Sequence, residues 1–383
     1  MVRNRKVFKK TVSIVNEKST DMYESLVGDK KGFLLESYDK NYDRYTFFGM
    51  EPEEIVTSRG NALVITKADG TEEVREGNPL ERLKEYYSEF HIEKEDEELS
   101  FSGGLVGNLG YDFVRYSEAL PDNNPDEIGI ETIQMMLMTS FLMVDHVAET
   151  LTAVVLEEPS EEGREQAMEK AGQMIKKAME KKECKRNFYH DGKIIKKSDS
   201  IEEYGEKVEK IKHYIREGHV FQTVLSQRWT IETRQTGFEL YKELRELNPS
   251  PYLYYFNYGT FEIIGSSPEM IVKKQENKVF TCPIAGTRKR GKDEAEDKRL
   301  RDELLSDEKE RAEHVMLVDL ARNDMGRISE FGTVKVTQFM EVQNYSHVMH
   351  IVSQVEGRKK GESHPLDLSL IHISEPTRPL YIS

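Results

Sequence analysis

The sequence has little cysteine and no long hydrophobic run, and each shortage excludes a class of protein. The two cysteines, Cys184 and Cys282, are far apart and form no CxxC pair, which indicates a reducing compartment and not a disulfide framework. The longest apolar stretch, residues 135–144, is half of the roughly 20 residues that a membrane span needs. No apolar segment of signal-peptide length follows the basic N-terminus, so we expect a cytoplasmic protein.

Positive charge is also in deficit. The chain has 55 Lys and Arg residues against 70 Asp and Glu residues, a formal net charge of -15 over 383 residues. Such a balance argues against nucleic acid or an anionic membrane as a partner. An anionic substrate would need a local basic pocket. The GxxxxGK[ST] motif of a phosphate-binding loop is absent.

The order of apolar patterns predicts an α+β fold. Residues 1–155 are mostly strand-like, 156–200 contain a helix and a linker, and 201–367 form a second domain. Long strands separated by few helices, without βαβ alternation, predict antiparallel sheets with helices packed against them. Residues 220–232 predict a strand that carries Gln222.

Four features could carry chemistry. "CPIAGTRKRG" (282–291) joins an apolar run and a Gly-Thr turn to basic residues, which we interpret as a loop. Glu269 lies beside a Pro-constrained turn and could act as a base. His347 and His350 point to opposite faces if they lie in one strand, so they would not share a metal. His350 could be an acid or base in a pocket, or a structural histidine.

Two glutamates, Glu310 and Glu313, are three residues apart and therefore share one helical face. The following "HVMLVDL" is apolar nearly all round, which predicts a buried helix. Carboxylates leading into a buried helix suit a hard cation such as Mg²⁺. They could equally be helix-start acids that complement the dipole, with Asp307 as the cap.

Several motifs in this order and spacing resemble the chorismate-utilising enzymes, and among them the large subunits of anthranilate synthases. The resemblance runs from about residue 30 to Asp367 and rests on these motifs: "VFQTVLSQR", "GSSPEM", "PIAGTRKRG", "DEKERAEHVMLVDLARNDMGR" and "VKVTQFMEVQNYSHVMHIVSQVEG". It implies an α+β fold, a layered sandwich of antiparallel sheets and helices, and a Mg²⁺-dependent reaction on chorismate. It also implies that Glu313 is a direct Mg²⁺ ligand and Glu310 a water-mediated one.

The resemblance also implies roles around the substrate. Gly286 and Thr287 would hold the ring and its substituents. His350 would be the acid or base that serves enolpyruvyl loss, and Glu269 would assist proton transfer. Glu269, Thr287 and His350 are thus the candidate catalytic residues.

Two positions distinguish the members of the family that use different nucleophiles. Relatives that add water carry a lysine where this chain has Gln222, and a neutral amide cannot act as that base. Aminodeoxychorismate synthases typically carry a lysine where this chain has Ala285. Direct attack by ammonia remains, with anthranilate and pyruvate as products. An aminodeoxychorismate synthase remains the alternative.

A further pair of motifs, "FLLES" (33–37) and "NPSPYLYYF" (248–256), resembles the tryptophan feedback site of anthranilate synthases. Glu36 and Ser37 would bind the amino-acid end of tryptophan, and Pro251, Tyr252 and Leu253 would line the rest. Ordinary strand and turn sequence is the other interpretation. A non-catalytic tryptophan-binding fragment is a third hypothesis for the whole chain.

Part of the family pattern is missing. No glutamine amidotransferase unit is present, so ammonia would come from a separate glutaminase subunit or from solution. Residues 368–383, "LSLIHISEPTRPLYIS", have no family character and are interpreted as foreign sequence. The family would continue there with a further carboxylate pair that completes the Mg²⁺ site. We therefore expect this polypeptide to be inactive and poorly stable.

Overall fold

The computed structural model describes residues 2–15, 17–37, 44–93, 99, 101–180, 189, 191–220, 222–345, 347–361, 364 and 366–367. They form two compact units, one of residues 1–182 with 244–383 and one of residues 183–243. The expected foreign tail, 368–383, and Cys184 lie outside the described residues. None of the helices in the described ranges is both long and apolar enough to cross a membrane.

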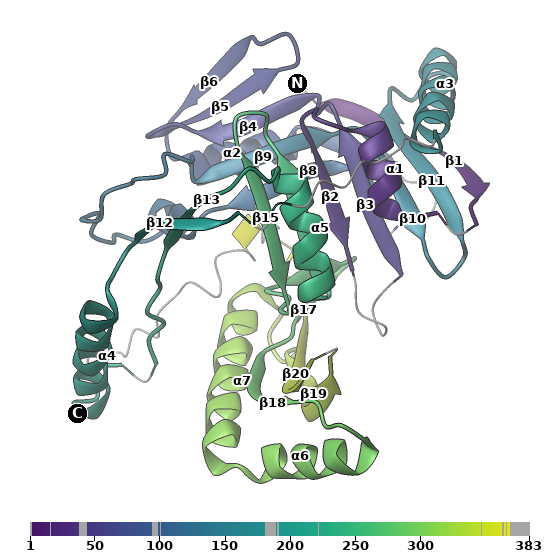
Figure 1. The fold of residues 1–383 in the computed structure, drawn as a ribbon. Helices are drawn as coiled ribbons and strands as arrows, with labels where there is room; N and C mark the ends of the chain where they lie inside the picture. The colour runs from purple at the N-terminus through teal and green to yellow at the C-terminus, as the bar shows by residue number, and fades with distance from the viewer. Residues whose placement is uncertain are drawn as a thin grey trace. The chain divides into compact units, whose positions relative to one another are not determined.

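The larger unit contains an eight-stranded sheet in the order β15-β14-β2-β3-β10-β11-β1-β7 (Figure 1). Its strands are β1 (Arg3–Ser13), β2 (Gly32–Glu36), β3 (Tyr45–Met50), β7 (Phe90–Glu93), β10 (Ser140–Asp145), β11 (Thr150–Glu157), β14 (Tyr252–Asn257) and β15 (Glu262–Ser267). All neighbours are antiparallel except β1 and β7. Strands from both halves of the chain therefore share one sheet, since β14 pairs with β2.

A second sheet, in the order β6-β5-β4-β9-β8, packs face to face with the first. Its strands are β4 (Glu54–Ser58), β5 (Ala62–Lys67), β6 (Glu72–Glu76), β8 (Gly104–Leu109) and β9 (Ile133–Met138). A short 3-10 helix, η1 (Tyr111–Tyr116), lies between β8 and β9 in the chain. Val106 and Met136 of this sheet share one core cluster with Phe33 and Phe141 of the first. The predicted layered sandwich is confirmed.

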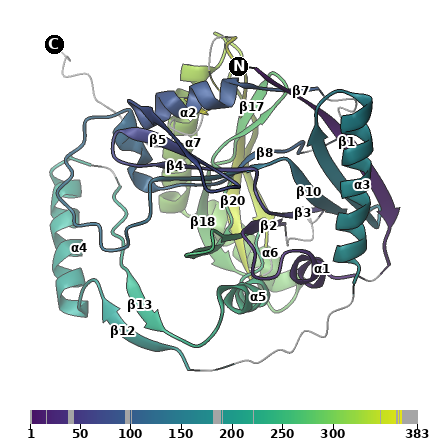
Figure 2. The ribbon, with the colours of Figure 1, turned by 90° about the horizontal axis from the view of Figure 1, so that it is seen from above.

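Helices cover the outer faces of both sheets. They are α1 (Ser19–Leu26), α2 (Pro79–Ser88) and α3 (Glu161–Ala178). Figure 2 shows α3 lying beside β1, and α1 packs against α3 and β3. On the second sheet, Leu80, Leu83 and Tyr86 of α2 pack into the cluster around Val56 and Leu63. The helix predicted within residues 156–200 is confirmed as α3.

A third sheet carries the candidate site. Its strands and helices are β16 (Lys273–Gln275), β17 (Lys278–Thr281), β18 (Ile284–Lys289), β19 (Lys335–Asn344), β20 (Val348–Arg358), α6 (Glu294–Ser306) and α7 (Glu308–Ile328). β20 pairs with β17 and β18 in succession and with β19 along most of its length. α6 and α7 pack on this sheet through two apolar clusters, one around Leu304 and Ile351 and one around Val318 and Val355.

The smaller unit holds β12 (Lys193–Lys197), α4 (Ile201–Arg216) and β13 (Trp229–Glu232), and α5 (Gly237–Leu247) runs from it into the larger unit. Ser200 begins α4 with a capping box to Glu203. Gly218 follows the helix in the left-handed conformation, with φ 78°, and ends it. The strand predicted over 220–232 is wrong for its first part, because β12 is only five residues long and pairs only as far as Trp229.

Candidate functional site

The Gly-Thr turn of "CPIAGTRKRG" is a β-bulge between β18 and β20. Ala285 pairs with Ile351 and Thr287 pairs with His350, so Gly286 is the extra residue. Its φ is +69°, and a Cβ there would lie 3.1 Å from Leu304 Cδ1 and 3.3 Å from a carboxylate oxygen of Glu310. Glycine is required by both the backbone conformation and the close approach. The bulge therefore brings the first turn of α7 against the turn of β18.

His350 faces this bulge with a defined ring orientation. Its Nδ1 lies 3.0 Å from the Gly286 carbonyl oxygen and 3.1 Å from Thr287 Oγ1. Because a carbonyl oxygen only accepts, Nδ1 carries the hydrogen, and Nε2 is the nitrogen that can take up or release a second proton. The edge of the Tyr345 ring packs against the imidazole, with centroids 5.3 Å apart. This geometry suits an acid or base, and Gly286, Thr287 and His350 lie together.

Glu310 and Glu313 lie in the first turns of α7. Asp307 caps this helix, since its carboxylate accepts from the backbone N–H groups of Lys309 and Glu310 at 3.0 and 3.2 Å. The predicted cap is confirmed. Within the described ranges, no group of three or more His, Cys, Asp or Glu side chains is arranged to hold a metal ion. Two carboxylates on one helix face still suit Mg²⁺, which takes one or two carboxylates with waters and substrate oxygens.

α7 is not buried all round, contrary to the prediction for "HVMLVDL". Val315 is 40% exposed, whereas His314 and Val318 are buried, so only one stripe of the helix faces the sheet. His314 Nε2 lies 2.6 Å from Ser353 Oγ, which also accepts from the Met340 N–H at 3.0 Å. Burial lowers the pKa of His314, which favours the neutral ring beside the Ser353 hydroxyl. This network fixes the rotation of α7 and therefore the face that carries Glu310.

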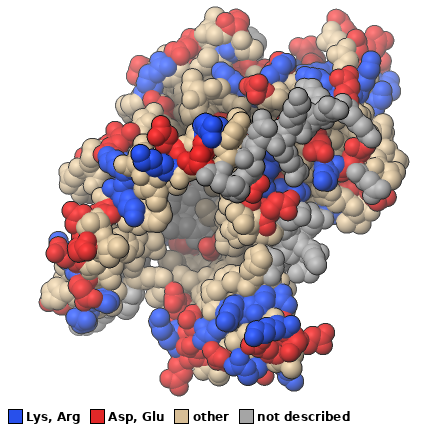
Figure 3. Space-filling model, viewed as in Figure 1, with Lys and Arg blue, Asp and Glu red and all other residues tan. Residues whose placement is uncertain are grey.

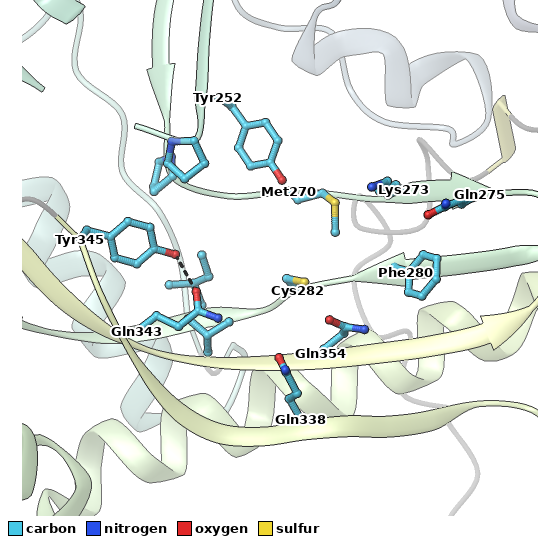
Figure 4. Close-up of a pocket in the computed structure, with 14 residues that line it drawn as sticks. Tyr252, Met270, Lys273, Gln275, Phe280, Cys282, Gln338, Gln343, Tyr345 and Gln354 are labelled. Carbon is cyan, nitrogen blue, oxygen red and sulfur yellow. Dashed lines mark hydrogen bonds between the residues drawn. The ribbon is translucent and has the colours of Figure 1, made fainter. Parts of the chain in front are cut away.

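A cavity of about 310 Å³ lies next to the bulge (Figure 4). Tyr345 lines it and also contacts His350, and its hydroxyl donates to Gln343 Oε1 at 3.3 Å. Cys282 and Gln354 form part of the strand wall, and Tyr252 lies across the cavity from them in Figure 4. The cavity offers amide, hydroxyl and apolar surface to a small molecule.

The Cys282 thiol in this wall should react slowly at neutral pH. Burial raises its pKa, nearby Lys273 opposes the shift, and Glu269 adds to it. The reactive thiolate should therefore appear only above the ordinary thiol value of about 8.5. We expect the rate of modification by Ellman's reagent, measured against pH in a Cys184→Ser variant, to have its midpoint above that value. A midpoint at or below it would contradict the burial of Cys282.

The other predicted site residues, Ala285, Glu269 and Gln222, lie in three different places. Ala285 is buried in β18 and offers no nucleophile. Glu269 is exposed just beyond β15, and its N–H donates to Ser267 Oγ at 3.3 Å. Gln222 is exposed in the smaller unit and lies outside any strand, which corrects the strand predicted for it.

All five predicted effector residues lie on or beside the β2–β14 pair. Glu36 is opposite Leu253 in the register, and its buried carboxylate accepts from Arg245 Nε at 3.0 Å and from the Ser19 hydroxyl. Among the described residues, the buried Ser37 hydroxyl has no hydrogen-bond partner. Pro251 and Tyr252, at the start of β14, also line the cavity of Figure 4.

The sequence interpretation missed the role of the basic residues after Thr287. Arg288 lies in β18 and contacts Glu303, Asp307 and the Thr287 carbonyl, so it is not a solvated loop residue. Arg290 binds Asp297 and the Tyr345 carbonyl. Figure 3 shows acidic and basic side chains interspersed over the surface of α6. The high density of acidic residues in 293–310, which can pair with these arginines, was the available signal.

Comparison with known proteins places this geometry in a family. Residues 32–370 match the family described as chorismate binding enzyme. Anthranilate synthase component 1 of Acetivibrio thermocellus is 40% identical over 348 residues, which cover 88% of this chain and 70% of that protein.

Solved structures agree. The crystal structure of anthranilate synthase component I from Streptococcus pneumoniae TIGR4 has 34% identity and a TM-score of 0.75, covering 86% of this chain and 72% of that one. A menaquinone-specific isochorismate synthase from Escherichia coli, at 12% identity and a TM-score of 0.59 over 97% of this chain and 74% of that one, shares the fold. This chain therefore belongs to the chorismate binding enzyme family, in the group of anthranilate synthase component 1.

Proposed function

We propose that this chain binds chorismate at the Gly286–Thr287 turn for conversion with ammonia to anthranilate and pyruvate. The observation that carries the proposal is the convergence of the bulge, the His350 imidazole and Glu310. The two relatives with 40% and 34% identity carry the name of this enzyme, which supports the choice of reaction. We also propose that the protein acts in tryptophan biosynthesis in the cytoplasm.

Each residue has a role that its contacts support. The Thr287 hydroxyl and the backbone at Gly286 orient the ring beside His350. His350 Nε2 moves a proton during loss of the enolpyruvyl group, and the exposed Glu269 assists proton transfer. Glu313 and Glu310 would hold Mg²⁺, directly and through water. The bound ion would neutralise a ring carboxylate and help the C4 hydroxyl to leave.

Ammonia is the proposed nucleophile. The Ala285 methyl cannot attack the ring, and Gln222 is a neutral amide that cannot deprotonate water. Ammonia adds at C2, the C4 hydroxyl leaves with a proton as water, and loss of pyruvate aromatises the ring. We propose that a glutamine amidotransferase subunit supplies the ammonia.

Tryptophan is the proposed inhibitor, bound at the end of β2. The Glu36 carboxylate offers an acceptor for its amino group, although that carboxylate already accepts from Arg245. The buried Ser37 hydroxyl, unpartnered among the described residues, offers a further polar contact. Leu253 is buried beside Glu36 and would pack against the effector.

We further propose that this polypeptide itself turns over little or no chorismate. Thr287 and Glu269 are exposed to water in the described structure, and a water-filled site weakens every electrostatic interaction within it.

Product analysis tests both the proposed inactivity of this polypeptide and the proposed choice of reaction. After incubation with chorismate, Mg²⁺ and ammonium, we expect no anthranilate fluorescence and recovery of chorismate by mass spectrometry. Anthranilate would confirm the reaction and contradict the inactivity. Isochorismate or 4-amino-4-deoxychorismate would contradict the choice of ammonia attack at C2.

A further inference from the structure

The Arg288 guanidinium joins three elements of the third sheet and its helices. Its Nε donates to Glu303 of α6 at 3.0 Å, and its Nη2 donates to Asp307, the cap of α7, at 2.8 Å. Its Nη1 donates to the Thr287 carbonyl at 3.0 Å, within β18 itself. The side chain is 21% exposed, so these contacts are partly shielded from water. A single side chain thus ties the bulged strand to the junction of α6 and α7.

The same guanidinium faces Glu310. Arg288 Nη1 lies 3.9 Å from Glu310 Oε1, and the other carboxylate oxygen of Glu310 faces Gly286. Glu310 is 20% exposed. Its carboxylate is therefore held between Arg288 on one side and the glycine of the bulge on the other. A displacement of the first turn of α7 would move the Glu310 carboxylate away from both Arg288 and Gly286.

We infer that Arg288 is a positioning residue, which fixes Glu310 at the Gly286–Thr287 turn by tying β18 to the start of α7. The metal part of this inference rests on the proposed function of Glu310. The planar fork of arginine can donate to several acceptors at fixed angles, whereas a lysine ammonium at the same place keeps only the charge. Geometry and charge can therefore be separated by one substitution.

The decisive variant is Arg288→Lys, and the probe is Mn²⁺, which suits the same oxygen ligands as Mg²⁺. Free Mn²⁺ is measured by electron paramagnetic resonance during titration of the protein. We expect Arg288→Lys to weaken Mn²⁺ binding by about 10-fold or more, as loss of a supporting contact to a metal ligand does. The matched control is Arg290→Lys, which breaks the neighbouring clamp to Asp297 and Tyr345. The Mn²⁺ affinity of Arg290→Lys should stay within about twofold of that of the unmodified chain, which is a small change compared with the one expected for Arg288→Lys.

A second readout does not depend on metal. Hydrogen exchange at the Lys309 and Glu310 amides, which donate to Asp307, reports the order of the first turn of α7. Arg288→Lys should speed this exchange and Arg290→Lys should not. Mn²⁺ affinity unchanged by Arg288→Lys, or exchange equal in the two variants, would overturn the inference. If the unmodified chain binds no Mn²⁺, the metal role of Glu310 fails, and exchange alone decides whether Arg288 positions the helix.

Discussion

Replacing Glu36 with leucine should lower the free energy of unfolding by about 3–5 kcal/mol, the usual cost of breaking a buried ion pair from one side. The Glu36 side chain is 2% exposed and that of Arg245 is 19% exposed. The substitution removes an acceptor of both Arg245 and the Ser19 hydroxyl, and it leaves the partly buried Arg245 guanidinium beside an apolar side chain. Urea unfolding monitored by fluorescence measures the change.

Two controls separate this loss from general damage. Glu51→Gln breaks the exposed pair with Lys30 and should cost no more than about 1 kcal/mol. The double variant Glu36→Leu/Arg245→Met removes both charges and should lose less than Glu36→Leu alone, because no unpaired charge remains. A loss for Glu36→Leu as small as that of Glu51→Gln would contradict the burial of this pair.

Gly286→Val should cost about 2–5 kcal/mol of stability and remove ligand binding at the bulge. The left-handed conformation costs a branched residue about 1–2 kcal/mol, and crowding adds about 1–3 kcal/mol. The crowding arises because the new Cβ would meet Leu304, Glu310 and Ile351 within 3.3 Å. Thermal or urea unfolding measures the first effect, and titration with chorismate measures the second.

The control for this variant is Gly326→Ala, on the helix that packs against the bulge. A Cβ at Gly326 meets nothing within 4 Å, and its φ lies outside the left-handed region. Alanine there should stabilise the helix by about 0.5–1 kcal/mol. Equal effects of the two substitutions would show that neither the conformation nor the contacts of Gly286 matter.

Local signals in the sequence predicted much of the fold. The "ADGT" turn joins β5 to β6, as its residue types predict. Asp307 caps α7 because its side chain can reach the N–H groups that the helix leaves unpaired. The strand over residues 348–358 follows from a run of β-branched and apolar residues.

Features that depend on distant partners could not be predicted this way. The bulge at Gly286 arises from the register of β18 on β20, some sixty residues along the chain. Arg288 looked like a loop residue because its carboxylate partners only meet it after α6 and α7 pack on the sheet. The segment before Trp229 has strand-forming residues, but β12 is too short to pair with it.

Gly286, Thr287, His350 and Glu310 lie close together in the structure, although each motif alone allowed a structural interpretation. Backbone geometry explains why the sequence left both interpretations of these residues open. The bulge, and not the amino-acid type, sets which carboxylate approaches the turn, so the spacing of Glu310 and Glu313 could not choose between a helix-start acid and a metal ligand.

The most direct test of the proposed site is calorimetric titration of this chain with chorismate, with Mg²⁺ and with EDTA in its place. We predict binding that requires Mg²⁺ and that is lost in His350→Ala and Glu313→Gln, while the folded state of both variants is verified by circular dichroism. Binding that persists in EDTA or in either folded variant, or no binding to the unmodified chain, would contradict a chorismate site at the Gly286–Thr287 turn.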